Sequence, residues 1–378
     1  MFSFEKFTLG TSNQHSMDFR YYNYLESKIS TIYKTCVAYD CKSITIISSI
    51  EYFKSKKNVR KILDLSKENK RHNFIRPSLY LSYEFGTNHS WLVVTPGRDY
   101  IEHYFSMIYD YNKIINGKLD VKYLFNPKDQ RLLIDDLNKQ IPIGKNRLAV
   151  IGDFTCLSAL LDGQLEVKQT ISLSKVNIEV YPHFDLLGIN FSFWGNLSYE
   201  IIHSLASKGY KEIIYVGKLG CLTSINDVYS KIFSPSDYIL YNKDQMIFKS
   251  NSLKNNLHSY IPGISSGKHV SVPTISEELS HQKEVFTRVG VFSIDNEISY
   301  MAQAIHEYNI RNDKPISFSC LHYATDYLPN DNEMKLDHQF DLSNCSHNCS
   351  KILKNLMLKK ILEIILEFSS RKLTFYNL

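Results

Sequence analysis

From residue 147 onward, short apolar segments of strand-like composition alternate with segments whose apolar residues recur at helical spacing. The apolar segments are residues 148–151, 178–180, 187–191, 213–216, 238–241 and 316–321. The helical segments are residues 197–207, 297–308 and 350–368. Strands that alternate with helices favour a mixed or mostly parallel sheet covered by helices on both faces. The pattern therefore predicts an α/β fold with a mixed sheet.

The first part of the chain has a different texture. It contains a helical pattern at residues 21–39, strand-like segments at 43–48 and 90–95, and a basic stretch at 54–71 that resembles a solvated helix. Pro127, Pro142 and Gly144 interrupt the chain before the alternation begins. We therefore predict an N-terminal accessory α/β region over residues 1–140, without an assigned role, and a second domain over residues 141–378.

Composition excludes several classes of protein. With 43% hydrophobic and 22% charged residues, the 378-residue chain is not expected to be disordered. A net charge of +5 without an Arg-rich or Gly-rich run argues against nucleic-acid binding. No apolar run approaches the about 18 residues of a membrane span, and no leader-like segment opens the chain. We expect no membrane contact.

The seven cysteines are scattered, which is not the pattern of a disulfide framework. Cys345, His347 and Cys349 do not have the spacing of a common zinc site. We therefore expect a cytoplasmic protein with reduced thiols, no metal and no cofactor.

Polar residues and glycines gather where predicted strands end. Gly152 and Asp153 follow one strand, Gly217, Lys218 and Gly220 form a glycine turn after another, and Asp326 follows a third. In open α/β sheets, ligands bind at the carboxyl ends of the strands. Asp295, Asn296 and Glu297 precede a helix whose apolar residues lie on one stripe. These residues predict a crevice for a small polar ligand.

Four motifs in this order resemble the purine nucleoside phosphorylase and nucleosidase superfamily over residues 147–368. They are Val-Ile-Gly-Asp at 150–153, Ile-Ile-Tyr-Val-Gly-Lys-Leu-Gly at 213–220, Ile-Asp-Asn-Glu at 294–297 and Thr-Asp at 325–326. The resemblance implies a three-layer α/β/α fold and cleavage of the N-glycosidic bond of a purine nucleoside or nucleotide. It also implies a homo-oligomer whose sites are completed by a neighbouring subunit.

The chemistry of that bond defines two roles. Its cleavage builds positive charge on the sugar and negative charge on the departing base, so the site needs a carboxylate at the ribose and a proton donor at the base. Glu297 matches the family's ribose-binding glutamate. Asp326 is the candidate acid, and His322 is the alternative.

The chain departs from the family where phosphate binds. Tyr215 stands where phosphorylases usually carry Arg, Lys218 stands where Ser usually follows the glycine, and no Arg occurs among Thr155, Cys156 and Leu157. Bidentate recognition of an oxyanion favours Arg over Lys. Three alternatives remain: hydrolysis by water, a different nucleophile or a phosphorylated substrate held by Lys218, and loss of catalysis. The last corresponds to a non-catalytic nucleoside-binding module, and a biosynthetic enzyme acting on an unusual ribosyl substrate is a further class.

Each candidate also has a purely structural interpretation. Glu297 is an acid at a helix N-terminus, which the helix dipole favours by itself. Asp326 and Asp153 suit turns, Lys218 suits a solvated loop, and the glycines suit tight backbone geometry.

Overall fold

The computed structural model contains two compact units. The N-terminal unit consists of Met1–Asp136, Phe191–Leu197 and Pro273–Val285, and the C-terminal unit of Leu137–Asn190, Ser198–Val272 and Phe286–Leu378. The residues that the structure describes are 19–49, 58–65, 77–84, 86–145, 147–243, 245–251, 253, 255–259, 264–328 and 348–376. The sequence placed a single boundary after residue 140, whereas here the chain returns to the N-terminal unit in two short segments.

The N-terminal unit has a 5-stranded sheet in the order β2-β3-β4-β1-β5. Its strands are β1 (Cys41–Ile47), β2 (Arg60–Asp64), β3 (Ser78–Glu84), β4 (Thr87–Val93) and β5 (Asp120–Leu124). Apolar residues of α1 (Phe19–Ala38) and α3 (Arg98–Ile114) pack on it, including Ile29 and Ile108. The prediction of a helix over residues 54–71 is wrong where the chain forms β2. Residues 54–57 and 66–71 lie outside the described residues.

The C-terminal unit is built on an 11-stranded sheet in the order β13-β12-β14-β15-β10-β6-β9-β8-β7, with β16 paired to β10 and β11. The strands are β6 (Leu148–Ile151), β7 (Gln169–Ser172), β8 (Val176–Val180), β9 (Phe184–Ile189), β10 (Glu212–Cys221), β11 (Ile232–Phe233), β12 (Asp237–Asn242), β13 (Gln245–Ser250), β14 (Lys268–Ser271), β15 (Val291–Asp295) and β16 (Ser317–Tyr327). Strands β6, β9, β10 and β16 are parallel, whereas β15 meets β10 antiparallel. The mixed sheet expected from the sequence is confirmed.

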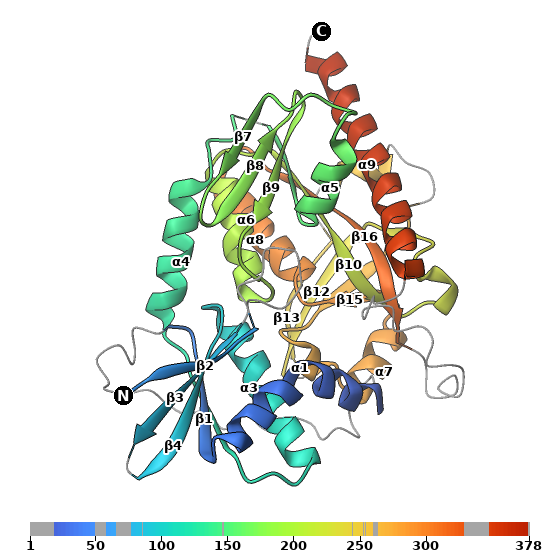
Figure 1. Cartoon of the computed structure of the whole chain (residues 1–378). Coiled ribbons are helices and arrows are strands. Elements are labelled where there is room, and N and C mark those ends of the chain that lie inside the picture. The colour runs from blue at the N-terminus through green and yellow to red at the C-terminus, as the bar shows by residue number, and fades with distance from the viewer. Residues whose placement is uncertain are drawn as a thin grey trace. The chain divides into compact units, whose positions relative to one another are not determined.

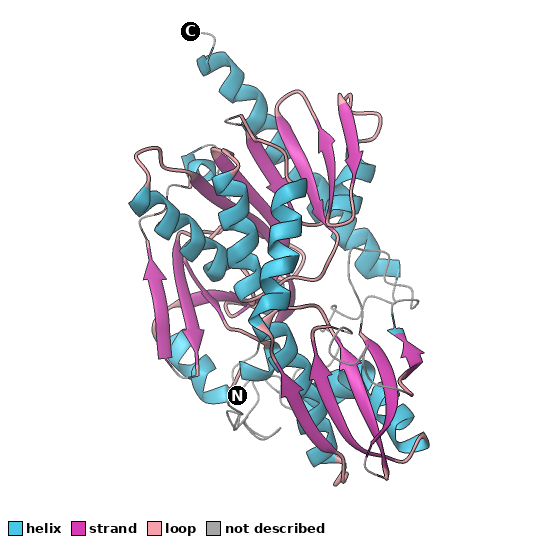
Figure 2. Ribbon diagram, turned by 90° about the vertical axis from the view of Figure 1, so that its left-hand side faces the viewer, coloured by secondary structure: helices cyan, strands magenta, loops and turns pink. Residues whose placement is uncertain are grey.

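Helices cover both faces of this sheet. On one face, α5 (Phe154–Leu161) and α9 (Asn348–Tyr376) lie together, and on the other lie α6 (Asn196–Ser207) and α8 (Ile298–Arg311) (Figure 1). Figure 2 distinguishes the strands from the covering helices by colour. The core under α9 joins apolar residues of five elements: Leu157 of α5, Val150 of β6, Val216 of β10, Leu321 of β16 and Ile361 of α9. The α/β class with helices on both faces of the sheet is therefore confirmed.

The remaining elements are α4 (Pro127–Gln140), α7 (Ser280–Arg288) and the short 3-10 helices η3 (Ile225–Asp227), η4 (Asn256–Ser259) and η5 (Ile275–Glu277). α4 occupies the stretch where proline and glycine suggested a boundary, and Pro127 is its first residue, a position that tolerates proline because the first turn needs no N–H partner. Among the described residues, no helix combines the length and the apolar character that crossing a membrane requires.

Two strands are longer than the sequence suggested. β10 continues through Gly217 and Gly220 to Cys221, and β16 continues through Asp326 to Tyr327. The two strands pair in parallel over this added length, with a register shift between Leu219 and Gly220. The predicted glycine turn at 217–220 is therefore wrong, as is the placement of Asp326 beyond a strand end. Pairing between β10 and β16 outweighs the usual preference of glycine for turns.

Candidate functional site

Gly217 and Gly220 bring neighbouring side chains close to the backbone of β10. A Cβ atom on Gly217 would lie 2.7 Å from His322 Nε2, and one on Gly220 would lie 2.8 Å from Leu328 Cδ1 and 3.1 Å from Asp326 Oδ2. Residues three apart on a strand face opposite sides of the sheet. The two glycines therefore admit His322 on one face and Asp326 on the other.

His322 is fully buried, and neither ring nitrogen has a hydrogen-bond partner within the described residues. Its ring packs edge-on against Tyr215, with ring centroids 4.7 Å apart. Burial lowers the pKa of His322 to about 3, so the imidazole is neutral near pH 7. A neutral imidazole is a poor proton donor but retains one basic nitrogen, which weakens the alternative of His322 as the acid.

Asp295 is the centre of a buried hydrogen-bond network at the end of β15. Its Oδ1 lies 2.8 Å from His269 Nε2 and accepts a hydrogen bond from Ser271 Oγ at 2.5 Å. The backbone N–H groups of Glu297 and Ile298 donate to the same carboxylate at 3.0–3.1 Å. Burial pushes the pKa of Asp295 upward, but the charge and hydrogen bonds of His269 lead the effects that lower it overall. Asp295 is thus an ionised cap for α8.

Glu297 occupies the N-cap position of α8 without capping the helix itself. Its carboxyl group is hydrogen-bonded to Asp295, and burial, followed by the negative charge of Asp295, raises the pKa of Glu297 well above its ordinary value. The ammonium group of Lys218 acts in the opposite direction. Two adjacent carboxyl groups share one proton, because repulsion between two negative charges disfavours the ionisation of both. Glu297 carries that proton, and it remains partly exposed.

Asn296 has a structural bond, since its Nδ2 donates to the carbonyl oxygen of Val272 at 2.8 Å. This bond ties the loop before α8 to the end of β14. Of the three neighbouring candidates, Asp295 and Asn296 therefore hold the loop, and Glu297 is a partly exposed acid beside them.

The turn at Gly152 and Asp153 is held by the last helix. Gly152 has φ +88°, and a Cβ there would lie 2.0 Å from the carbonyl oxygen of Val216, so only glycine fits. Lys354 Nζ lies 3.0 Å from Asp153 Oδ1, and Tyr323 donates to Asp153 Oδ2 at 3.4 Å. The negative charge of Asp153 thus has a partner from a helix 201 positions away in sequence.

Asp326 accepts a hydrogen bond from Thr325 Oγ1 at 2.8 Å and pairs in register with Gly220. Gly220 is also the register partner of Ile294, so β10 separates Asp326 from β15 by a single strand. Both Asp326 and the loop carrying Glu297 therefore lie near the carboxyl-terminal part of β10.

The predicted site residues differ from their surroundings in exposure. The candidates that keep some solvent exposure are Gly152, Asp153, Gly217, Lys218, Asn296, Glu297 and Asp326. The residues that precede them in β6, β10 and β15 are buried. We call these partly exposed candidate residues together the polar edge of the sheet. The arrangement offers a carboxyl group, an ammonium group and backbone at glycine to a polar molecule.

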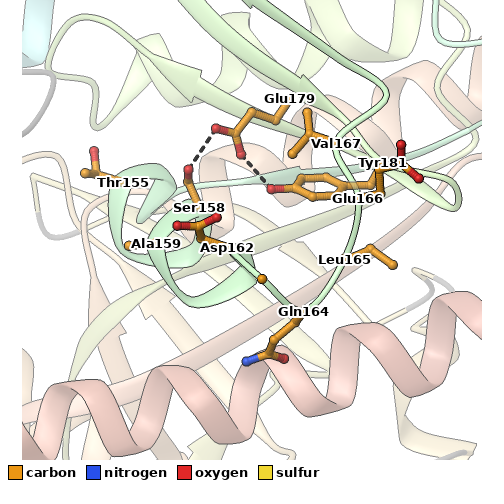
Figure 3. Close-up of a pocket in the computed structure, with 11 residues that line it drawn as sticks. Thr155, Ser158, Ala159, Asp162, Gln164, Leu165, Glu166, Val167, Glu179 and Tyr181 are labelled. Carbon is orange, nitrogen blue, oxygen red and sulfur yellow. Dashed lines mark hydrogen bonds between the residues drawn. The ribbon is translucent and has the colours of Figure 1, made fainter.

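A cavity of about 670 Å³ lies elsewhere, beside α5 and β8 (Figure 3). Within it, Glu179 accepts hydrogen bonds from Ser158 Oγ and Tyr181 OH, each at 2.7 Å. None of the predicted site residues lines this cavity.

The sequence did not predict three of the side chains that organise the polar edge, which are His269, Ser271 and Lys354. His269 and Ser271 alternate along β14 as Ser293 and Asp295 do along β15, and this shared period of two was the available signal. Lys354 had no comparable signal, because it is one of several lysines of its helix. Among the described residues, no group of three or more His, Cys, Asp or Glu side chains is arranged to hold a metal ion. Cys345 and His347 lie outside the described residues.

No protein-family model matches the chain. The chain is 28% identical over 324 residues to a protein of Cordyceps militaris named oxidoreductase cns1. The match covers 79% of this chain and 40% of that protein, so the chain spans well under half the length of the curated relative.

Solved structures of nucleoside-processing enzymes are similar to part of the chain. A methylthioadenosine phosphorylase from an antarctic soil metagenomic library has a TM-score of 0.43 at 13% identity, covering 60% of this chain and 88% of that one. The 5'-methylthioadenosine nucleosidase of Arabidopsis thaliana has a TM-score of 0.43 at 13% identity, covering 61% and 97%. A uridine phosphorylase from Vibrio fischeri has a TM-score of 0.41 at 10% identity, covering 61% and 93%.

Proposed function

We propose that the C-terminal unit binds a purine nucleoside or nucleotide at the polar edge and cleaves its N-glycosidic bond with water. The observation that carries this proposal is the pairing of Glu297 with Asp295 at the entrance of α8. The carboxyl group is hydrogen-bonded to Asp295, and Glu297 as a whole remains partly exposed. The proton of Glu297 is shared with Asp295, and the oxygen lone pairs that remain on Glu297 suit hydrogen bonds donated by ribose hydroxyls.

In the proposed reaction, Asp326 gives a proton to a nitrogen of the departing base, which takes the electron pair of the broken bond. A water oxygen forms the new bond to the sugar carbon, and its spare proton returns to the protein. Asp326 suits the acid role better than His322, since the lowered pKa of His322 leaves its imidazole neutral.

Water is favoured over phosphate by the surroundings of Tyr215. Burial, with the negative charge of Asp295, raises the pKa of Tyr215 well above its ordinary value, so the phenol is neutral where a phosphate ion would need a cation. Lys218 is exposed and offers a point charge at the rim of the polar edge. This favours an anionic group of the substrate as its partner, rather than the attacking species.

The test is to incubate the whole chain with a panel of nucleosides and nucleotides, with and without inorganic phosphate, and to measure free base by chromatography. Base released equally in both conditions supports hydrolysis. Base released only with phosphate contradicts the proposed role of water while preserving cleavage of the glycosidic bond. A homo-oligomer stays a prediction, which sedimentation of the same sample measures.

A non-catalytic nucleoside-binding module is the second candidate. It is favoured by the enclosure of His322, whose side chain has no exposed surface through which bulk water arrives. Saturable binding of a nucleoside without any release of base identifies this alternative. If the chain is instead a biosynthetic enzyme acting on an unusual ribosyl substrate, the ribosyl group is transferred to an acceptor other than water.

A further inference from the structure

Two cysteines of the N-terminal unit meet where α1 passes into β1. Cys36 lies in the last turn of α1, and Cys41 is the first residue of β1. The connection is tight: Tyr39 N donates to Thr35 O at 3.1 Å and Asp40 N donates to Val37 O at 2.9 Å. Asp40 adopts φ 49°, a left-handed conformation that reverses the chain direction. The turn therefore brings the two side chains together.

The two thiols are hydrogen-bonded to each other. Ser90 of β4 contributes to the same cluster, with its Oγ 3.3 Å from Cys36 Sγ and donating to Ser43 O at 3.0 Å. The Ser90 hydroxyl also forms a hydrogen bond with Cys41. The backbone turn and β4 thus hold both sulfur atoms in one place, so their contact does not depend on a chance rotamer.

The surroundings of the two sulfur atoms differ. Cys36 has no exposed surface, whereas Cys41 is only partly buried. The hydrogen bond from Cys36 lowers the pKa of Cys41 to about 7, and the same contact, together with burial, raises the pKa of Cys36 far above its usual range. A reagent from solvent therefore meets a sulfur that is ionised in a large fraction near neutral pH, with a protonated thiol behind it.

We propose that Cys36 and Cys41 form a reversible oxidation site, in which a peroxide attacks at Cys41 and Cys36 resolves the product into a disulfide. In the first step the Cys41 thiolate attacks one peroxide oxygen, an S–O bond forms as the O–O bond breaks, and the departing hydroxide takes a proton from the solvent to become water. In the second step Cys36 forms the S–S bond, the S–O bond breaks and a second water leaves. In total the two thiols lose two protons and two electrons, which equal two hydrogen atoms, and one hydrogen peroxide becomes two waters.

The test uses the complete chain, treated with a small excess of hydrogen peroxide at pH 7 and then with N-ethylmaleimide. Both cysteines fall within one tryptic peptide, residues 35–42, because Lys34 and Lys42 flank them. We expect this peptide to lose two hydrogen atoms and to resist alkylation until dithiothreitol is added. Cys221 and Cys320, which are buried, serve as internal controls and stay reduced under the same treatment.

The matched variant is Cys36→Ser, with Cys36→Ala as a second form in case the first folds poorly. Without the resolving thiol, Cys41 should stop at the sulfenic acid or gain two oxygen atoms as the sulfinic acid, and no mass loss should occur. The proposal is overturned if the wild-type peptide itself accumulates sulfinic acid, or if both of its thiols remain open to alkylation after peroxide. Neither result depends on whether the C-terminal unit cleaves nucleosides.

Discussion

His269 Nε2 lies 2.8 Å from Asp295 Oδ1, and both side chains are buried between β14 and β15. The pair fixes the carboxylate that caps α8, and this carboxylate in turn fixes the proton on Glu297. We therefore infer that His269 positions Glu297 through Asp295.

Replacement of His269 by Leu should destabilise the C-terminal unit strongly, because it leaves the buried carboxylate of Asp295 without its histidine partner. Breaking such a pair costs about 3–5 kcal/mol. The measurement is urea unfolding followed by far-UV circular dichroism. Both tryptophans, Trp91 and Trp194, belong to the N-terminal unit, so fluorescence reports that unit separately.

The matched control is Arg311→Met, which breaks the exposed pair between Arg311 and Glu307 on α8. Exposed pairs contribute little, so its unfolding curve should match the wild type. Equal stabilities of His269→Leu and Arg311→Met would show that the buried pair does not hold the loop.

His322 should make the C-terminal unit sensitive to mild acid. Its pKa is about 3 in the folded chain against an ordinary 6.5, so between these values the unfolded chain binds a proton that the folded chain does not. The resulting stability is complete above pH 6.5 and is lost as pH falls, by about 2 kcal/mol at pH 5. In His322→Gln, the loss of unfolding free energy from pH 7 to pH 5 should be smaller by this amount. An unchanged pH dependence would mean that water reaches the imidazole.

Gly217→Ala should destabilise the chain because the new Cβ would lie 2.7 Å from His322 Nε2. Overpacking of this kind costs about 1–3 kcal/mol. In the background of His322→Ala the same substitution should cost much less, since the clashing ring is gone. The double-mutant cycle in urea measures this coupling, and strictly additive effects would contradict the close approach of β10 and His322.

Lys354→Met should slow the reaction of Cys156 with iodoacetamide at pH 8. Burial raises the pKa of Cys156, and the ammonium group of Lys354 opposes that rise, so its removal leaves less thiolate. Lys359→Met, an exposed position on the same helix, is the control and should react at the wild-type rate. A rate unaffected by Lys354→Met would place the lysine away from the turn at Asp153.

The alternation of strands and helices was enough to predict the α/β class, since buried strands such as β6 and β9 are continuous apolar runs. The ends of β10 and β16 were not predictable, because Gly217, Gly220 and Asp326 favour turns locally and only the pairing between these strands keeps them extended. Where a strand ends in this region depends on its pairing with the neighbouring strand, and the sequence of one strand alone does not show that pairing.

The candidate site was predictable where a motif is local, as at residues 294–297. The sequence did not indicate which of the two acids caps α8. The structure shows that Asp295 does so, a role considered for Glu297. Nor did it indicate Lys354 beside Asp153, since that contact joins two elements far apart in the chain. Opposite faces for His322 and Asp326 follow from the register shift in β10, which has no sequence signature.

The proposed function depends most directly on Glu297. We predict that Glu297→Ala, which removes the carboxyl group, lowers the rate of base release at least about 100-fold, as loss of a group that contacts the transition state does. Glu363→Gln, on the exposed side of α9, is the control and should keep the wild-type rate. The measurement is the time course of free base from the best nucleoside of the panel. Equal rates for the wild type and Glu297→Ala would contradict the assignment of the polar edge as the ribose site.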